Sequence, residues 1–111
     1  MSNSFNFNSI KKQFLTTTLP DENNTTILVL TPNKKLMDEL VHLESTLQNS
    51  NAAAETVIDD LYSLVAKLMS CNKGGVVITK DKLEECVDFE DLIAYFKVYT
   101  SFVHNITSSK N

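Results

Sequence analysis

Residues 54–69 constrain the fold more than any other part of this sequence. Their apolar side chains recur every three or four positions, which is the period of one face of an α-helix. The polar run that follows contains Gly74 and Gly75, and glycine readily adopts the left-handed conformation that closes a helix. We therefore predict a helix whose wide apolar face is the most buried surface of the protein. That face comprises Ala54, Val57, Ile58, Leu61, Leu64, Val65, Leu68 and Met69.

A second helix is predicted from Thr31 to Leu47, because its leucines recur at helical spacing. Thr31 offers a hydroxyl that caps free amides, and Pro32 suits the first helical position. A short third helix is predicted after Thr79, which is also a suitable cap. The apolar residues are Leu36, Met37, Leu40, Val41, Leu43 and Leu47 in the former, and Leu83 and Cys86 in the latter.

The last predicted helix covers residues 88–106 and has the clearest start signal in the chain. Asp88 is its expected cap, and Val87 is placed to contact Leu92 as a hydrophobic staple. One face of this helix is unusually aromatic. It comprises Leu92, Tyr95, Phe96, Tyr99, Phe102, Val103 and Ile106.

Two segments before the helices, residues 12–19 and 25–31, are rich in the β-branched, aromatic and other apolar residues typical of strands. Residues 20–24 between them start with proline and continue with aspartate and asparagine, which favour a turn. Two strands alone are marginally stable in water, so this hairpin must pack on the helices or pair with another chain. We therefore predict an α+β, mainly α fold, in which an N-terminal β-hairpin precedes three to four helices.

The length of 111 residues suits one domain, and a hydrophobic content of 42% is sufficient for a core. We expect a single domain of hairpin and helices over residues 12–106. Residues 1–11 are rich in asparagine and serine with two aromatics, and they form either a flexible arm or an extra strand. The polar residues 107–111 are expected to be a mobile tail.

The charge pattern argues against nucleic acid and membrane partners. The net charge is −4, and all ten basic residues are lysines. Affinity for nucleic acid comes mainly from neutralising phosphates, and arginine is the best donor to them. No segment has the roughly 18 consecutive apolar residues of a membrane span, and the first residues do not resemble a secretory signal. We therefore expect a protein of the cytoplasm, with Cys71 and Cys86 unpaired.

Catalytic and cofactor signals are weak throughout the sequence. Asp38 and His42 lie four residues apart, but two ligands do not make a metal site. A cleft in which these two and other polar groups converge would change that interpretation. The acidic run over residues 81–91 is either a patch for a basic partner or a set of charges that favour helix N-termini. We therefore expect no enzyme and no cofactor.

Apolar surface remains as the feature with a functional interpretation. An aromatic helix face is usually core, but so small a domain has few layers in which to bury three such faces and a hairpin. We therefore predict that part of the last helix contacts other proteins, where aromatics are enriched, through Phe96, Tyr99, Phe102 and Val103. The unpaired hairpin edge is a second docking surface, and we predict self-association through Thr26, Leu28 and Leu30.

The order of segments resembles one known family, the small tail assembly chaperones of long-tailed bacteriophages and prophages of Gram-positive bacteria. The resemblance extends from about residue 12 to residue 106. It is carried by FLTTTLPD (14–21), TPNKKL (31–36), LYSL (61–64), SCNK (70–73), IT (78–79) and DFEDLIAYF (88–96), followed by Tyr99 and Phe102.

The resemblance implies a non-catalytic chaperone that acts in the cytoplasm of the bacterial host. Such a protein would bind the long helical tape measure protein, and possibly the tail tube protein, before the tube polymerises, and it would tend to form homo-oligomers. Two other classes remain open. One is a small adaptor or inhibitor that docks one globular host or phage partner, and the other is a small enzyme or metal-binding protein.

Overall fold

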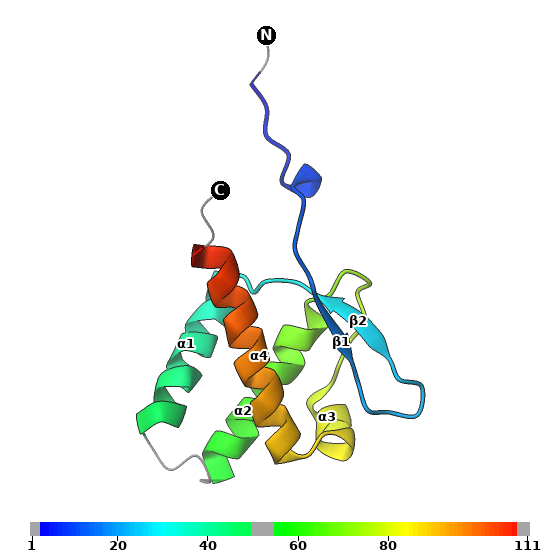
Figure 1. The fold of residues 1–111 in the computed structure, drawn as a ribbon, viewed down its shortest axis with the longest axis vertical. Helices are drawn as coiled ribbons and strands as arrows, with labels where there is room; N and C mark the ends of the chain where they lie inside the picture. The colour runs from blue at the N-terminus through cyan, green and yellow to red at the C-terminus, as the bar shows by residue number, and fades with distance from the viewer. Residues whose placement is uncertain (1–2, 50–54, 109–111) are drawn as a thin grey trace.

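The computed structural model describes residues 3–49 and 55–108. Figure 1 shows their order along the chain. A short 3₁₀ turn, η1 (Phe7–Ser9), precedes strands β1 (Leu15–Thr18) and β2 (Thr26–Val29). Helices α1 (Lys34–Asn49), α2 (Glu55–Ser70), α3 (Lys80–Cys86) and α4 (Phe89–Ser108) follow. The predicted α+β, mainly α fold with an N-terminal hairpin is confirmed.

The two strands form an antiparallel pair in which Leu15 lies opposite Val29. Asp21 holds the turn, because its carboxylate accepts hydrogen bonds from the backbone amide of Thr25 at 2.9 Å and from its hydroxyl at 2.7 Å. The chain therefore reverses where the proline, aspartate and asparagine predicted a turn. Both strands are shorter than predicted, because the chain beyond Leu30 turns towards α1 and leaves residues 12–14 without a partner strand.

Helix α2 lies at the centre of the fold, in contact with α1, α3, α4 and β2. The wide face predicted from its spacing is buried, and Leu61 and Val65 have no exposed area. Ala54, the first residue assigned to that face, lies outside the described residues. The buried members of the face are Val57, Leu61, Leu64, Val65, Leu68 and Met69, and Ile58 is half-buried.

Three of the helices start at a capping side chain. Thr79 accepts a hydrogen bond from the amide of Lys82 at 3.1 Å, and Asp88 accepts one from the amide of Asp91 at 2.8 Å, both as predicted. The prediction for α1 was wrong by two residues. Asn33 is its cap, since the Asn33 side chain accepts from the amide of Leu36 at 2.9 Å. Asparagine caps a helix at least as well as threonine.

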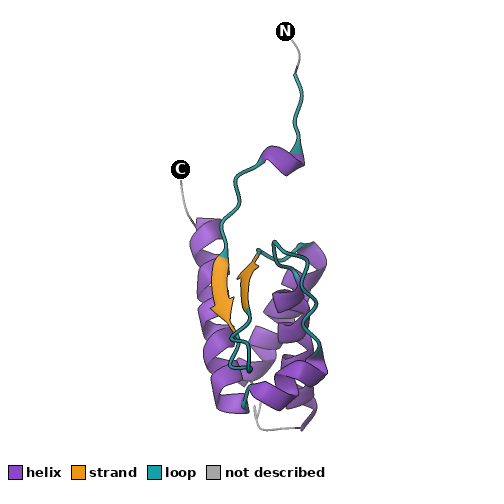
Figure 2. Cartoon of the chain, turned by 90° about the vertical axis from the view of Figure 1, so that its right-hand side faces the viewer, coloured by secondary structure: helices purple, strands orange, loops and turns teal. Residues whose placement is uncertain are grey.

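The hairpin packs on the helices through two tyrosines of α4. The hydroxyl of Tyr99 donates to the carbonyl of Leu30 at 3.3 Å. The hydroxyl of Tyr95 lies 2.9 Å from that of Thr17 in β1. Figure 2 shows the resulting layers, with the hairpin in front of the helices. The predicted need for the hairpin to pack on other elements is thus met within one chain.

The N-terminal residues lead away from the body of the molecule (Figures 1 and 2). Residues 3–11 contain the turn η1 and no strand. The structure therefore does not show the extra strand that was one of the two alternatives for this segment. At the other end, α4 continues to Ser108, so residues 107 and 108 belong to the helix and not to the expected tail, and residues 109–111 lie outside the described residues. No helix in the described part of the chain is long and apolar enough to cross a bilayer.

Candidate protein-binding site

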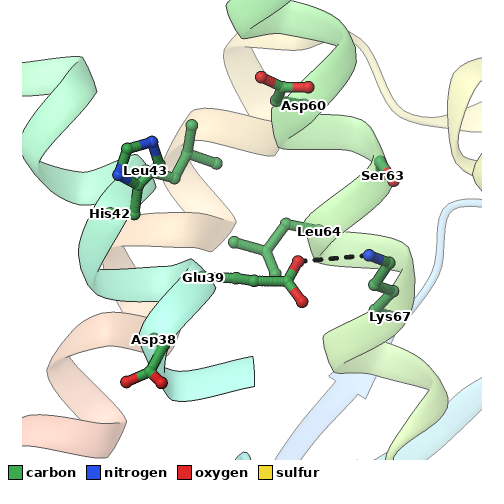
Figure 3. Close-up of a pocket in the computed structure, with 8 residues that line it drawn as sticks. All are labelled: Asp38, Glu39, His42, Leu43, Asp60, Ser63, Leu64 and Lys67. Atoms are coloured by element: carbon green, nitrogen blue, oxygen red, sulfur yellow. Dashed lines mark hydrogen bonds and ion pairs between the residues drawn. The ribbon is translucent and has the colours of Figure 1, made fainter. Parts of the chain in front are cut away.

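A hollow of about 390 Å³ lies between α1 and α2 (Figure 3). The Nζ atom of Lys67 lies 3.2 Å from Oε1 of Glu39, which joins the two helices. Figure 3 shows Asp38 and Asp60 towards opposite ends of the hollow. Its lining consists of Asp38, Glu39, His42, Leu43, Asp60, Ser63, Leu64 and Lys67.

Asp38 and His42 therefore do line a cleft with other polar groups, the arrangement that would favour a chemical site. The carboxylate of Asp38, however, pairs with Nζ of Lys34 at 2.8 Å, one turn earlier on α1. Among the described residues, no three His, Cys, Asp or Glu side chains are placed to hold a metal ion. Protein metal sites use three or more ligands. Among the described residues, Asp38 and His42 have no third ligand and so do not form a metal site.

The acidic run over residues 81–91 is used in local contacts. Asp88 caps α4, and Glu84 lies 3.5 Å from Lys80, one turn earlier on α3. Lys82, the only cation inside the run, lies 2.9 Å from Asp21 of the hairpin turn. The cap made by Asp88 supports the interpretation that acids of this run serve helix N-termini, whereas the contact with the hairpin is made by Lys82.

The Asp21–Lys82 pair fastens the hairpin turn to α3. Only 12% of the Asp21 side chain is exposed. The hydrogen bonds from Thr25 lower the pKa of the Asp21 carboxyl far below its usual range, and Lys82 adds to this effect. The hydrogen bond that Lys82 donates to Asp21 raises the pKa of Lys82. The turn is therefore held by a carboxylate that stays charged in the folded protein.

The four residues predicted to bind partners on α4 do not form a surface. Phe96, Tyr99 and Val103 are buried, with at most 4% of each exposed, and Phe102 is half-buried. Burial also raises the pKa of the Tyr99 hydroxyl. As a contact surface this assignment is wrong for Phe96, Tyr99 and Val103, because their side chains lie in the core. For the half-buried Phe102 it stays a prediction.

An apolar groove that the sequence did not predict lies between α1 and α4. Its volume is about 310 Å³, and Phe96 forms part of its wall. The side chains of Leu47 and Ile93 are half-buried there and leave apolar surface open to a partner. The groove is lined by Glu44, Leu47, Gln48, Ile93, Phe96, Lys97 and Thr100.

Spacing along the sequence assigned Leu47 to the buried stripe of one helix and left Ile93 out of the face of the other. Only the packing of both helices on α2 brings the two side chains into one groove. The sequence held one signal for this groove, which was Ile93, an apolar residue just outside the predicted face of the last helix. Such residues line grooves when a neighbouring helix stands beside them.

The strand edge predicted for self-association is largely occupied. The amide of Leu30 donates to the carbonyl of Cys71 at 2.8 Å, and the amide of Lys73 donates to the carbonyl of Leu28 at 2.9 Å. Residues 71–73 therefore lie beside β2 as a short third strand would. Of the predicted residues, Leu28 and Leu30 already have a backbone partner on that edge, and Thr26 lies beyond the pairing. This prediction was wrong because the loop after α2 turns back onto β2.

No protein-family model, curated protein or solved structure matches this chain.

Proposed function

We propose that this chain is a non-catalytic tail assembly chaperone, and that it holds an amphipathic helix of the tape measure protein in the groove between α1 and α4. The observation that carries the proposal is the groove itself. Its apolar lining consists of the half-buried Leu47 and Ile93 and the buried Phe96. The partner's identity comes from the family resemblance.

The groove suits a helix better than a small ligand. It is an open trough between two helices, and amphipathic helices bind such troughs through apolar residues spaced three and four apart. Its rims carry Glu44 on α1 and Lys97 on α4. Opposite charges on the two rims favour a helix with complementary charges beside its apolar stripe, and so they favour one orientation.

The chemistry of this binding explains a chaperone's task. A long helical protein that awaits its tube exposes apolar stripes, and exposed stripes of that kind aggregate. A small protein that covers one stripe protects it until tube subunits take its place. The tail tube protein is then a second partner, which acts when the chaperone leaves. These steps take place in the cytoplasm of the bacterial host.

Where a long helical protein is encoded directly downstream of this chain's gene, the test uses synthetic peptides for its amphipathic helices. Isothermal calorimetry should detect binding to at least one peptide. Ile93→Glu places a charge on the apolar wall, so we expect the affinity to fall at least about tenfold, or about 1.4 kcal/mol. Leu47→Glu should behave in the same way.

Val41→Glu is the matched control. Val41 lies on α1 like Leu47 but is 56% exposed and does not line the groove. Its substitution should leave binding and the circular dichroism spectrum unchanged. If Ile93→Glu folds normally and binds every peptide as the wild type does, the groove is not the site. If the chain instead forms a stable complex with one globular protein and with no helical peptide, the adaptor function replaces the chaperone function.

A further inference from the structure

A narrow apolar seam holds helix α1 to the rest of the molecule. Among residues 34–48, whose side chains the structure describes, only Leu40 and Leu43 are buried. Eight side chains of α2 are buried, although the two helices have the same length. In the described part of the chain, α2 is also the only element against which α1 packs closely. Burial therefore holds α1 in place far less firmly than it holds α2.

Open hollows flank this seam on both sides. The polar hollow of about 390 Å³ lies between α1 and α2, and the apolar groove of about 310 Å³ lies between α1 and α4. The buried side chain of Leu64 lines the first, and that of Phe96 lines the second. Packed interiors leave few spaces of this size. Water can therefore approach the Leu40–Leu43 seam from either flank.

Two polar contacts reach from α1 to its neighbours, and both are too exposed to fasten it. The Nζ atom of Lys67 lies 3.2 Å from Oε1 of Glu39, with 53% and 36% of the two side chains exposed. The Nε2 atom of His104 lies 3.7 Å from Oε2 of Glu44, and 67% of the His104 side chain is exposed. Exposed pairs of this kind contribute little to stability.

The polar contacts that shape α1 lie within the helix and its cap. Asn33 caps it by accepting from the amide of Leu36. Further along, the hydroxyl of Thr46 donates to the carbonyl of His42 at 3.0 Å. Neither contact is lost when α1 moves relative to α2, so the helix can move as one body.

A two-residue connection joins this helix to the fixed part of the hairpin. The amide of Leu30 donates to the carbonyl of Cys71, and the carbonyl of Leu30 accepts from the hydroxyl of Tyr99. The next two residues, Thr31 and Pro32, have no hydrogen bond with another described residue. Hinge motions are commonly absorbed by a few residues at the end of an element. Thr31 and Pro32 are therefore placed as the hinge of α1.

We propose that α1 is a movable wall of the groove, which swings away from α2 about its hinge and admits the partner helix. The movement joins Leu64 and Phe96, which now border separate hollows, into one apolar floor. The apolar stripe that α1 lays over the body consists of leucines at spacings of four, three and four residues. The partner is therefore a helix with large apolar side chains at similar spacing. Its admission rests on the proposed function, whereas the motion is a property of the free chain.

Native-state hydrogen exchange of the full chain measures the motion without any partner. A detached helix of this length is marginal in water, so its amides exchange when α1 swings away. We expect the protection factors of α1 to lie at least about tenfold below those of α2. Equal protection in the two helices overturns the proposal, because α1 would then open only when the whole domain unfolds.

A double variant tests whether the motion controls partner binding. His42→Leu and Ser63→Leu place apolar side chains in the α1–α2 hollow, and neither residue lines the α1–α4 groove. This contact should hold α1 in place and raise its protection. The affinity for the helical peptide should fall at least about tenfold, because less of the protein is in the open state. The matched control is Lys35→Leu with Thr56→Leu, at exposed positions of the same helices that line neither hollow. It should leave both measurements unchanged.

Leu40→Ala tests the same motion in the opposite direction. It shortens a buried side chain of the seam, so exchange in α1 should become at least about tenfold faster relative to that in α2. If the double variant protects α1 but binds the peptide as the wild type does, while Ile93→Glu does not bind, the wall does not control entry and the proposal is overturned. If no helical peptide binds the wild-type chain, the proposed function fails, and the exchange measurements still decide whether α1 moves.

Discussion

The two edges of the β-hairpin differ in what lies beside them. β2 is built into the molecule, because residues 71–73 pair with its outer edge and it contacts α2. Val29 on this strand has no exposed area. β1 contacts the body through Leu15, which packs on the core, and through Thr17, which contacts Tyr95, and no described segment pairs with its outer edge. Among the described residues, β2 is thus paired on both edges, whereas β1 has one edge that is free to pair.

The difference follows from the direction of the chain on each side. Residues 71–73 emerge from the end of α2, directly beside β2, so the edge is covered by the next segment of the core. Residues 3–13 enter β1 from outside the body, and all of them are exposed (Figure 1). The segment that lies beside each edge therefore decides which edge is free. If the two strands differ in this way, a change to β2 or to its cover should lower stability more than a change to β1 or to the turn.

Removing buried volume from β2 should have the largest effect. Val29→Ala deletes two methyl groups in a fully buried position, and we expect a loss of roughly 2–3 kcal/mol in the free energy of unfolding. Leu15→Ala, on the half-buried β1 partner of Val29, should cost less. Urea unfolding followed by circular dichroism measures both. Equal losses would show that the two strands are equally built in.

Loosening the segment that covers β2 should have an intermediate effect. The side-chain nitrogen of Asn72, Nδ2, donates to the carbonyls of Met69 at 2.8 Å and Val76 at 2.7 Å. The side-chain oxygen, Oδ1, accepts from the backbone amide of Val76 at 2.9 Å. Asn72 is buried although residues 73–77 around it are exposed, and Asn72→Ala leaves these groups without their partners, at a cost of about 1–3 kcal/mol. Hydrogen exchange should then speed up at the amides of Leu30 and Lys73. Unchanged exchange there would mean that the cover does not depend on Asn72.

The smallest effect is expected at the hairpin turn, and it should depend on pH. Asp21→Asn keeps an oxygen that accepts from Thr25 but loses the charge that faces Lys82. The folded-state pKa of Asp21 is lowered. Its stabilising contribution is therefore present above the unfolded value of about 4 and is lost as the pH falls below it.

The melting temperatures of wild type and Asp21→Asn should accordingly differ most near neutral pH and converge on acidification. The raised pKa of Lys82 has the opposite sign. Its contribution is full below the unfolded value of about 10.4 and disappears as the pH rises through the folded value. The two melting curves should therefore converge in alkali as well. A constant difference at every pH would exclude the ion pair as the cause.

The sequence by itself determined the elements of this fold. Helical spacing located α1, α2 and α4, and Thr79 and Asp88 cap the helices that they were expected to cap. Turn residues located the hairpin. Each of these signals acts between residues a few positions apart, so it can be read without knowing the rest of the structure. The cap of α1 was misplaced because Thr31 and Asn33 are both good caps, and spacing alone does not choose between them.

Tertiary structure alone decided which surfaces remain for a partner. Phe96, Tyr99 and Val103 became core because α2 and the hairpin both pack on α4. Ile93, outside the predicted face, came to line a groove because α1 stands beside it. Likewise the β2 edge closed and the β1 edge stayed open because a loop far along the chain returned to one of them. Burial and pairing depend on which distant segments meet, and no local pattern contains that information.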